Sequence, residues 1–189
     1  YNGGSLYVAD AERREYDQNG LPTAYYSLKT LGLPRSSFTL SNSNNAFSNY
    51  ESIASISYNS LGRPRTVTEY GHIPTTYVWG YKSTLPIAVV RGATSSQVTS
   101  ALGGASSWES LEKALVPTMT ASALHAALSG ISGALVTVYE HNPYIGMVKS
   151  IAPNGETTTY DYDSFARLIR ITDHSGTITN KFQYHYRNE

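Results

Sequence analysis

Two aspartates near the C-terminal end of the chain have the residue types and the spacing of an acid–base pair. In the stretch YDYDSFARLIRITDHSG (160–176), Asp161 and Asp163 are separated by one residue and would point the same way from a strand. Paired carboxylates act as general acid and general base only where their surroundings move the two pKa values apart. The neighbouring sequence supplies neither a matching base nor an apolar pocket. We therefore interpret Asp163 as the first residue of a turn and disfavour a glycosidase-like pair.

The other residue types that could do chemistry lack the spacing that such chemistry requires. There is no G-x-S-x-G motif, and ALGGASS (101–107) lacks the lysine of a phosphate-binding loop. The three aspartates Asp161, Asp163 and Asp173 lack the dense Asp/Gly loop that binds calcium. No two histidines have metal-ligand spacing: His72, His125, His141, His174 and His185. We expect no catalytic residue, no metal and no cofactor, and keep a hidden hydrolase as the disfavoured alternative.

Composition excludes several classes of partner. The 189 residues include 14 basic and 14 acidic side chains, a net charge of +0, which argues against a strong field for nucleic acid or an anionic membrane. There is no cysteine, hence no disulfide, and no stretch approaches the apolar length of a membrane span. The chain begins at Tyr1, so we expect residues upstream. Tyrosine, which favours pleated strands, occurs 16 times.

A short turn motif occurs three times, as YDQNGLP (16–22), YNSLGRP (58–64) and YDSFARL (162–168). Asp or Asn at the first turn position and Gly at the fourth predict a type I turn, because the short side chain accepts backbone hydrogen bonds and glycine tolerates positive φ. In the third copy Ala166 takes the glycine position, so that turn must avoid positive φ or carry strain. The predicted turn and register residues of these two later copies are Tyr58, Asn59, Gly62, Arg63, Asp163 and Arg167.

A second motif runs from glycine through threonines into alternating aromatic residues. It occurs at 71–81, 155–163 and 176–186, and Gly155 and Gly176 lie 21 residues apart, which predicts a hairpin-sized repeat. Between these repeats, residues 94–133 are rich in Ala, Ser and Leu. Helices are predicted over 95–104, over 106–117 with a Ser106–Glu109 capping box, and over 120–131, with one apolar face on the sheet. Residues 36–50 are polar and predict a surface loop.

These motifs resemble the YD repeats of bacterial RHS-type proteins. The resemblance rests on YNSLGRP, GETTTYDYDSFARLIRITDHSG and GTITNKFQYHY, and on TTYVWGYKSTLPIAVV with NPYIGMVKSIAPNGETTTYDYD, which are similar to the C-terminal region of secreted members. It covers residues 50–92 and 134–189. It implies a segment of a large secreted or cell-surface bacterial protein whose repeats form long β-sheets. Some members coil into a shell around a toxin, and others act in adhesion or have been linked with carbohydrate. Neither a self-cleaving protease motif nor a toxin domain is evident.

We therefore expect a mainly β (α+β) fold, in which antiparallel YD-repeat hairpins form an open curved sheet with an insert of two or three short helices. The expected organisation is an irregular N-terminal segment with one YD-like turn (1–50), hairpin repeats (51–93), the helical insert (94–133) and C-terminal hairpins (134–189), all in one structural unit. We predict a non-enzymatic structural or interaction module. Its partners would be upstream repeats of the same chain or a second copy, joined through sheet edges.

Rows of aromatic residues are the candidate ligand-binding positions, and glycans are the candidate ligands. Rings that share a strand face can stack on sugar rings or pack across strands, and only rings left exposed would favour binding. The alternative function is thus a carbohydrate-binding module. The predicted rows are Tyr77, Trp79 and Tyr81; Tyr160 and Tyr162; and Tyr184 and Tyr186.

Overall fold

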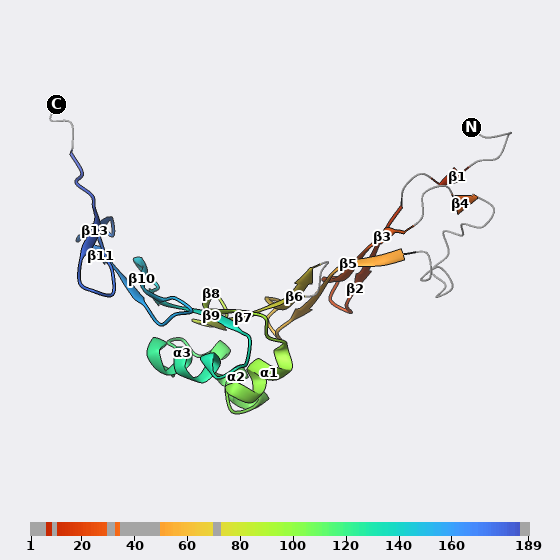
Figure 1. Ribbon diagram of the computed structural model, residues 1–189, viewed down its shortest axis with the longest axis horizontal. Helices are drawn as coiled ribbons and strands as arrows, with labels where there is room; N and C mark the ends of the chain where they lie inside the picture. The colour runs from red at the N-terminus through yellow and green to blue at the C-terminus, as the bar shows by residue number, and fades with distance from the viewer. Residues whose placement is uncertain (1–6, 9–10, 30–32, 35–49, 70–72, 186–189) are drawn as a thin grey trace. The chain divides into compact units, whose positions relative to one another are not determined.

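The computed structural model describes residues 7–8, 11–29, 33–34, 50–69 and 73–185. The chain divides into two compact units, Tyr1–Ile73 and Pro74–Glu189. In both units the described strands pair antiparallel, and those of the second unit follow chain order. The described residues of the second unit also form three helices (Figure 1). The expected mainly β class with a helical insert is confirmed. That the segments act as one structural unit stays a prediction.

Two hairpins make up most of the described part of the first unit. Strand β2 (Glu12–Tyr16) pairs with β3 (Pro22–Leu28), β3 pairs with β5 (Tyr50–Tyr58), and β5 pairs with β6 (Pro64–Glu69). A short pair joins β1 (Tyr7–Val8) to β4 (Leu33–Pro34). The expectation of an irregular segment over 1–50 is wrong for 12–28, because the turn at 17–21 closes a regular hairpin. The surface loop expected over 36–50 lies outside the described residues except for Tyr50, which begins β5.

The described residues of the second unit form seven strands whose order in the sheet is their order in the chain. Every neighbouring pair is an antiparallel hairpin, and β13 is the last strand of the series. The strands are β7 (Pro74–Gly80), β8 (Leu85–Arg91), β9 (Leu135–Asn142), β10 (Gly146–Ile151), β11 (Thr157–Tyr162), β12 (Leu168–Thr172) and β13 (Ile178–Lys181).

The helical insert lies between β8 and β9, and its two ends meet. Arg91 and Leu135 are still in register, and a Cβ on Gly92 would stand 2.9 Å from the carbonyl oxygen of Gly133. The insert contains α1 (Ser95–Ala101), α2 (Ala105–Lys113) and α3 (Ala121–Ser129). None of the helices in the described part of the chain is both long and apolar enough to cross a membrane.

Helix capping differs from the prediction. The capping box belongs to α1, where Thr94 and Gln97 exchange hydrogen bonds, and not to Ser106 and Glu109. Helix α2 begins one residue earlier than expected, after Gly104 with a φ of +111° and no side-chain cap, so Ser106 lies inside the helix. Glu109 instead forms an ion pair of 2.9 Å with Lys113 one turn later.

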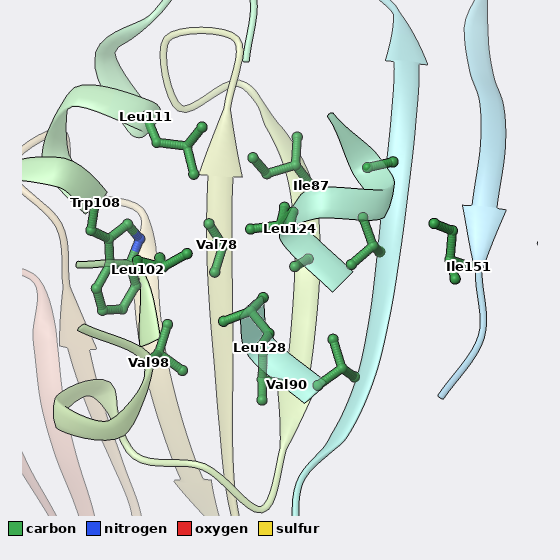
Figure 2. Packing of buried hydrophobic residues seen from close by; sticks show 14 of the residues in the cluster. Val78, Ile87, Val90, Val98, Leu102, Trp108, Leu111, Leu124, Leu128 and Ile151 are labelled. Atoms are coloured by element: carbon green, nitrogen blue, oxygen red, sulfur yellow. The ribbon is translucent and has the colours of Figure 1, made fainter. Parts of the chain in front are cut away.

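The insert covers one face of the sheet, as expected. Figure 2 shows helix side chains such as Leu124 and Leu128 packed against Val78, Ile87 and Val90 of the strands. Each of these side chains is at most 2% exposed. Full burial of one aliphatic side chain contributes about 1.5–3 kcal/mol, so the helices supply much of the stability of strands β7–β9.

Candidate functional site

Four turns in the described residues share one hydrogen-bond pattern. The N–H of the first turn residue donates to the carbonyl of the fifth at 2.9 Å, and the N–H of the fourth donates to the carbonyl of the first at 3.0–3.1 Å. The first side chain then accepts hydrogen bonds from the third and fifth N–H groups at 2.8–3.0 Å. This pattern fits the predicted type I turn, and a bulge, which was not predicted, follows it as a register shift in the flanking strands. The first residues are Asp17, Asn59, Asp163 and Asp173.

The fourth turn position requires the left-handed backbone region. Gly62 and Gly176 have φ values of +73° and +84°, which glycine adopts without strain. Ala166 has a φ of +59°, so of the two alternatives left open by the sequence the third motif copy adopts the strained one. A left-handed non-glycine residue costs roughly 1–2 kcal/mol.

The strained turn also contains a close ion pair. Asp163 Oδ2 accepts from Arg167 Nη2 at 2.6 Å and from Arg167 Nε at 2.8 Å. These hydrogen bonds hold the pKa of the Asp163 carboxyl below its usual value. Arg63 is the fifth residue of the turn that begins at Asn59, as Arg167 is in the turn that begins at Asp163. Its N–H donates to Asn59 Oδ1 at 2.9 Å.

A fifth turn shows that the backbone pattern does not need the aspartate. Ala152 N–H donates to Glu156 O and Gly155 N–H donates to Ala152 O, both at 2.8 Å. Here Asn154 Oδ1 accepts from Glu156 N–H at 3.0 Å. Gly155, predicted as a turn residue, has a φ of +84°.

A tyrosine hydroxyl links neighbouring strands beside these turns. Tyr58 Oη donates to Pro22 O at 2.7 Å, and Tyr162 Oη donates to Met147 O at 2.8 Å. Tyr184 Oη likewise donates to Leu168 O at 2.8 Å. We call this contact the tyrosine latch. Each accepting carbonyl belongs to the residue directly after the last residue of a neighbouring turn, where the next strand starts. A latch therefore links the end of one strand to the start of the strand beside it.

Two of the latch tyrosines, Tyr58 and Tyr162, are half-buried at the ends of their strands, whereas Tyr184 is 46% exposed. Burial raises the pKa of the Tyr58 and Tyr162 hydroxyls. A Cβ on Gly146 would lie 3.1 Å from Tyr162 Oη, so glycine leaves room for that latch. This contact was not predicted from the sequence, although the tyrosines that open the second and third motif copies, Tyr58 and Tyr162, both form it.

The predicted aromatic row on β7 is broken at Tyr81. Tyr77 and Trp79 share a face with ring centroids 6.4 Å apart. Tyr81 lies beyond the strand with a φ of +51° and is only 7% exposed, and its Oη donates to His141 O at 2.6 Å. Because strand alternation ends at Gly80, Tyr81 enters the core side and cannot extend the row.

Five rings nevertheless share the sheet face away from the helices. Residues that pair directly across neighbouring strands point to the same face of the sheet. On this face lie Tyr77, Val89 and Thr137, followed by Tyr139, Ser150 and Thr158. Tyr160 and Tyr162 follow Thr158 on the same side of β11. All five rings are half-buried: Tyr77, Trp79, Tyr139, Tyr160 and Tyr162. We call this surface the aromatic face.

The remaining predicted ring positions do not join the aromatic face. Tyr184 forms a latch, and the guanidinium of Arg167 lies over its ring at 4.5 Å from the centroid. Tyr186 lies outside the described residues.

The carboxylates of the opening stretch are engaged in structural contacts. Asp161 pairs with Arg170 at 2.7 Å, and Asp163 pairs with Arg167. Asp173 accepts from Ser175 Oγ at 2.7 Å, the largest cause of its lowered pKa. Among the residues that the structure describes, no group of three or more His, Asp or Glu side chains could hold a metal ion.

Comparison with solved structures shows a shared fold. The chain matches a crystal structure of TcdB2-TccC3-TEV with a TM-score of 0.52 and 9% identity, over 92% of this chain and 8% of that one. It also matches the Photorhabdus luminescens Tc holotoxin pore with a substitution in TccC3, with a TM-score of 0.50 and 11% identity, over 95% of this chain and 7% of that one. The chain thus spans less than a tenth of each of these structures. No family model and no curated protein matches the chain.

Proposed function

We propose that the chain is a non-enzymatic structural module of an RHS-type repeat protein, one segment of a larger secreted or cell-surface bacterial protein. The observation that carries the proposal is the combination of the repeated turn with the tyrosine latch. A unit that repeats its turn geometry and fastens neighbouring strands by a latch, as Tyr58, Tyr162 and Tyr184 do, can be extended without a new core. The fold likeness to a small part of Tc toxin chains agrees with the resemblance of the sequence to YD repeats.

The partners of such a module are further repeats of the same chain or a second copy. Strand β13 is the last strand of its series, and its four residues are exposed. The latch of Tyr184 keeps the chain beyond β13 in the register of the repeat. An added strand would therefore meet a correctly positioned edge.

A one-repeat extension tests this proposal. In this variant a second copy of residues 164–185 replaces residues 186–189. Tyr184 and Tyr162 both form latches, so His185 takes the place of Asp163 and the copied segment continues the repeat. In a repeat protein each added unit contributes stability through its neighbour. We expect higher thermal stability and slower hydrogen exchange of the β13 amides. The control is the same extension with proline at the copied Ile169 and Ile171. Unchanged exchange at β13 in the first variant would refute the repeat-module role.

The second candidate is binding of a neutral glycan. The observation that favours it is the aromatic face, which combines five rings with the hydroxyls of Ser150, Thr158 and Thr137. A glycan array with the parent chain and a folded Trp79→Ala, Tyr160→Ala variant tests it. Binding to one glycan class that the variant loses would support this function, and an array without binding would remove it.

A further inference from the structure

A small cavity opens beside the helical insert, on the side of the sheet opposite to the aromatic face. Its volume is about 280 Å³, just below the usual range for pockets that hold drug-sized ligands, so it suits a smaller molecule. Its walls are formed by four segments: the turn after β7, the segment between α2 and α3, the start of α3 and the end of β9. Its floor is apolar, with Ile87 and Leu124, and Val116 and Met119 border it.

The cavity is preformed. Ile87 and Leu124 are each 2% exposed and belong to the core cluster, where Figure 2 shows them close together between β8 and α3. The ring of Tyr81 in the wall is held by two hydrogen bonds with His141, since Tyr81 Oη donates to His141 O at 2.6 Å and accepts from His141 N–H at 3.2 Å. Fixed walls lower the ordering cost of binding.

The wall also contains a strained backbone. Tyr81, Lys82 and Ser83 have φ values of +51°, +56° and +56°. The N–H groups of Lys82 and Ser83 donate to Ala114 O and Glu112 O, both at 2.9 Å, so the turn is held by the end of α2. Residues in such strained conformations cluster at ligand-binding and switch sites.

One charge sets the chemistry of the cavity. Among the described lining residues Glu140 alone carries a formal charge. Lys149 lies opposite Glu140 in the β9–β10 register, yet in the described part of the chain no ion pair joins them. The start of α3 adds a positive partial charge of about half a unit, smaller than the full charge of the carboxylate. The Thr120 hydroxyl caps α3 by accepting from Ala123 N–H.

We propose that this cavity binds an apolar organic cation. The apolar part, about the size of a phenyl or branched alkyl group, would rest on Ile87 and Leu124. Its ammonium or guanidinium group would face Glu140, beside the ring of Tyr81, which favours a cation. The ligand is either a free amine or a lysine or arginine next to an apolar residue of a protein partner. This site is independent of the proposed structural role.

The test is a titration of the ¹⁵N-labelled chain followed by amide chemical shifts. The probe is phenethylammonium, and the matched anion is 3-phenylpropionate. We expect shifts at residues 116, 118–121 and 140 with phenethylammonium only, with a dissociation constant on the order of 1 mM. The blocked dipeptide N-acetyl-Phe-Lys-amide represents the protein source, so its binding relative to phenethylammonium distinguishes the two sources. Absence of shifts with both cations, or equal shifts with the anion, overturns the proposal.

Two variants locate the site. Glu140→Gln keeps the shape and removes the charge, and we expect binding to weaken by roughly two- to five-fold, the range for an exposed ion pair. Glu69→Gln, which removes an exposed carboxylate of the first unit, is the matched control and should bind as the parent does. Thr118→Phe adds bulk at an exposed lining position and should abolish the shifts. Equal affinity of the parent and the Glu140 variant would overturn the cation site.

Discussion

Two regions of the second unit reach stability by different means. Strands β7–β9 lie under three helices, and the buried cluster runs from Val78 to Ile151. Strands β11–β13 contain no fully buried side chain among their described residues, yet their turns carry dense hydrogen-bond sets. The comparison teaches that one sheet can combine a packed core with hairpins whose register is fixed at their ends by turns and latches.

The largest expected difference between the regions is the cost of removing an apolar side chain. Leu128→Ala deletes a fully buried residue of α3 and should lower the free energy of unfolding by about 2–5 kcal/mol. Ile171→Ala on β12 removes a half-buried residue and should cost less. Urea denaturation of both variants measures the two losses. Equal losses would show that the hairpins depend on a core as much as β7–β9 do.

The fourth turn position provides a matched pair of substitutions with opposite signs. Gly62→Ala places a side chain at a φ of +73° and should destabilise by roughly 1–2 kcal/mol. Ala166→Gly relieves the strain at a φ of +59°, partly offset by the greater freedom of the unfolded chain, and should stabilise by about 0.5–1 kcal/mol. Thermal unfolding measures both. A destabilised Ala166→Gly variant would contradict the strain at that turn.

Removal of a latch hydroxyl is expected to have a smaller effect. Tyr162→Phe leaves the Met147 carbonyl without this donor and should cost about 0.5–1.5 kcal/mol. Faster hydrogen exchange should appear in β10 and β11. Tyr77→Phe is the control, because the ring stays on the aromatic face and its hydroxyl forms no latch. If the two variants unfold alike, the latch contributes nothing measurable.

Acid should weaken the turns before it weakens the helical core. The pKa values of Asp163 and Asp173 are lowered in the folded chain, so their stabilising contribution is present above the unfolded value near 3.8 and is lost as pH falls through the folded pKa. Melting temperatures from pH 6 to pH 2 should show a shallower decline below pH 4 for Asp163→Asn than for the parent. Identical profiles would mean that Asp163 does not contribute.

The sequence predicted those features whose cause lies within a few residues. Asp163 and Gly176 specify their turns locally, and the spacing of apolar residues over 120–131, which include Leu124 and Leu128, specifies the buried face of α3. The tyrosine latch depends on a carbonyl far along the chain, such as Met147 for Tyr162, and local patterns do not reveal it. The left-handed turn at Tyr81 depends on carbonyls at the end of α2, so strand alternation alone placed that ring on the wrong side.

The meeting of Gly92 and Gly133 has a consequence for what the fold can accept. Topologically, residues 92–134 are a lengthened hairpin loop, and each doubling of loop length costs only about 0.6 kcal/mol. Replacing a turn of a few residues by this segment therefore costs roughly 2 kcal/mol in loop-closure entropy. The apolar side chains that the segment buries stabilise the fold by more than that. The β8–β9 hairpin is thus an insertion site. Another segment whose two ends lie close together could replace residues 92–134 without changing the register of β8 and β9.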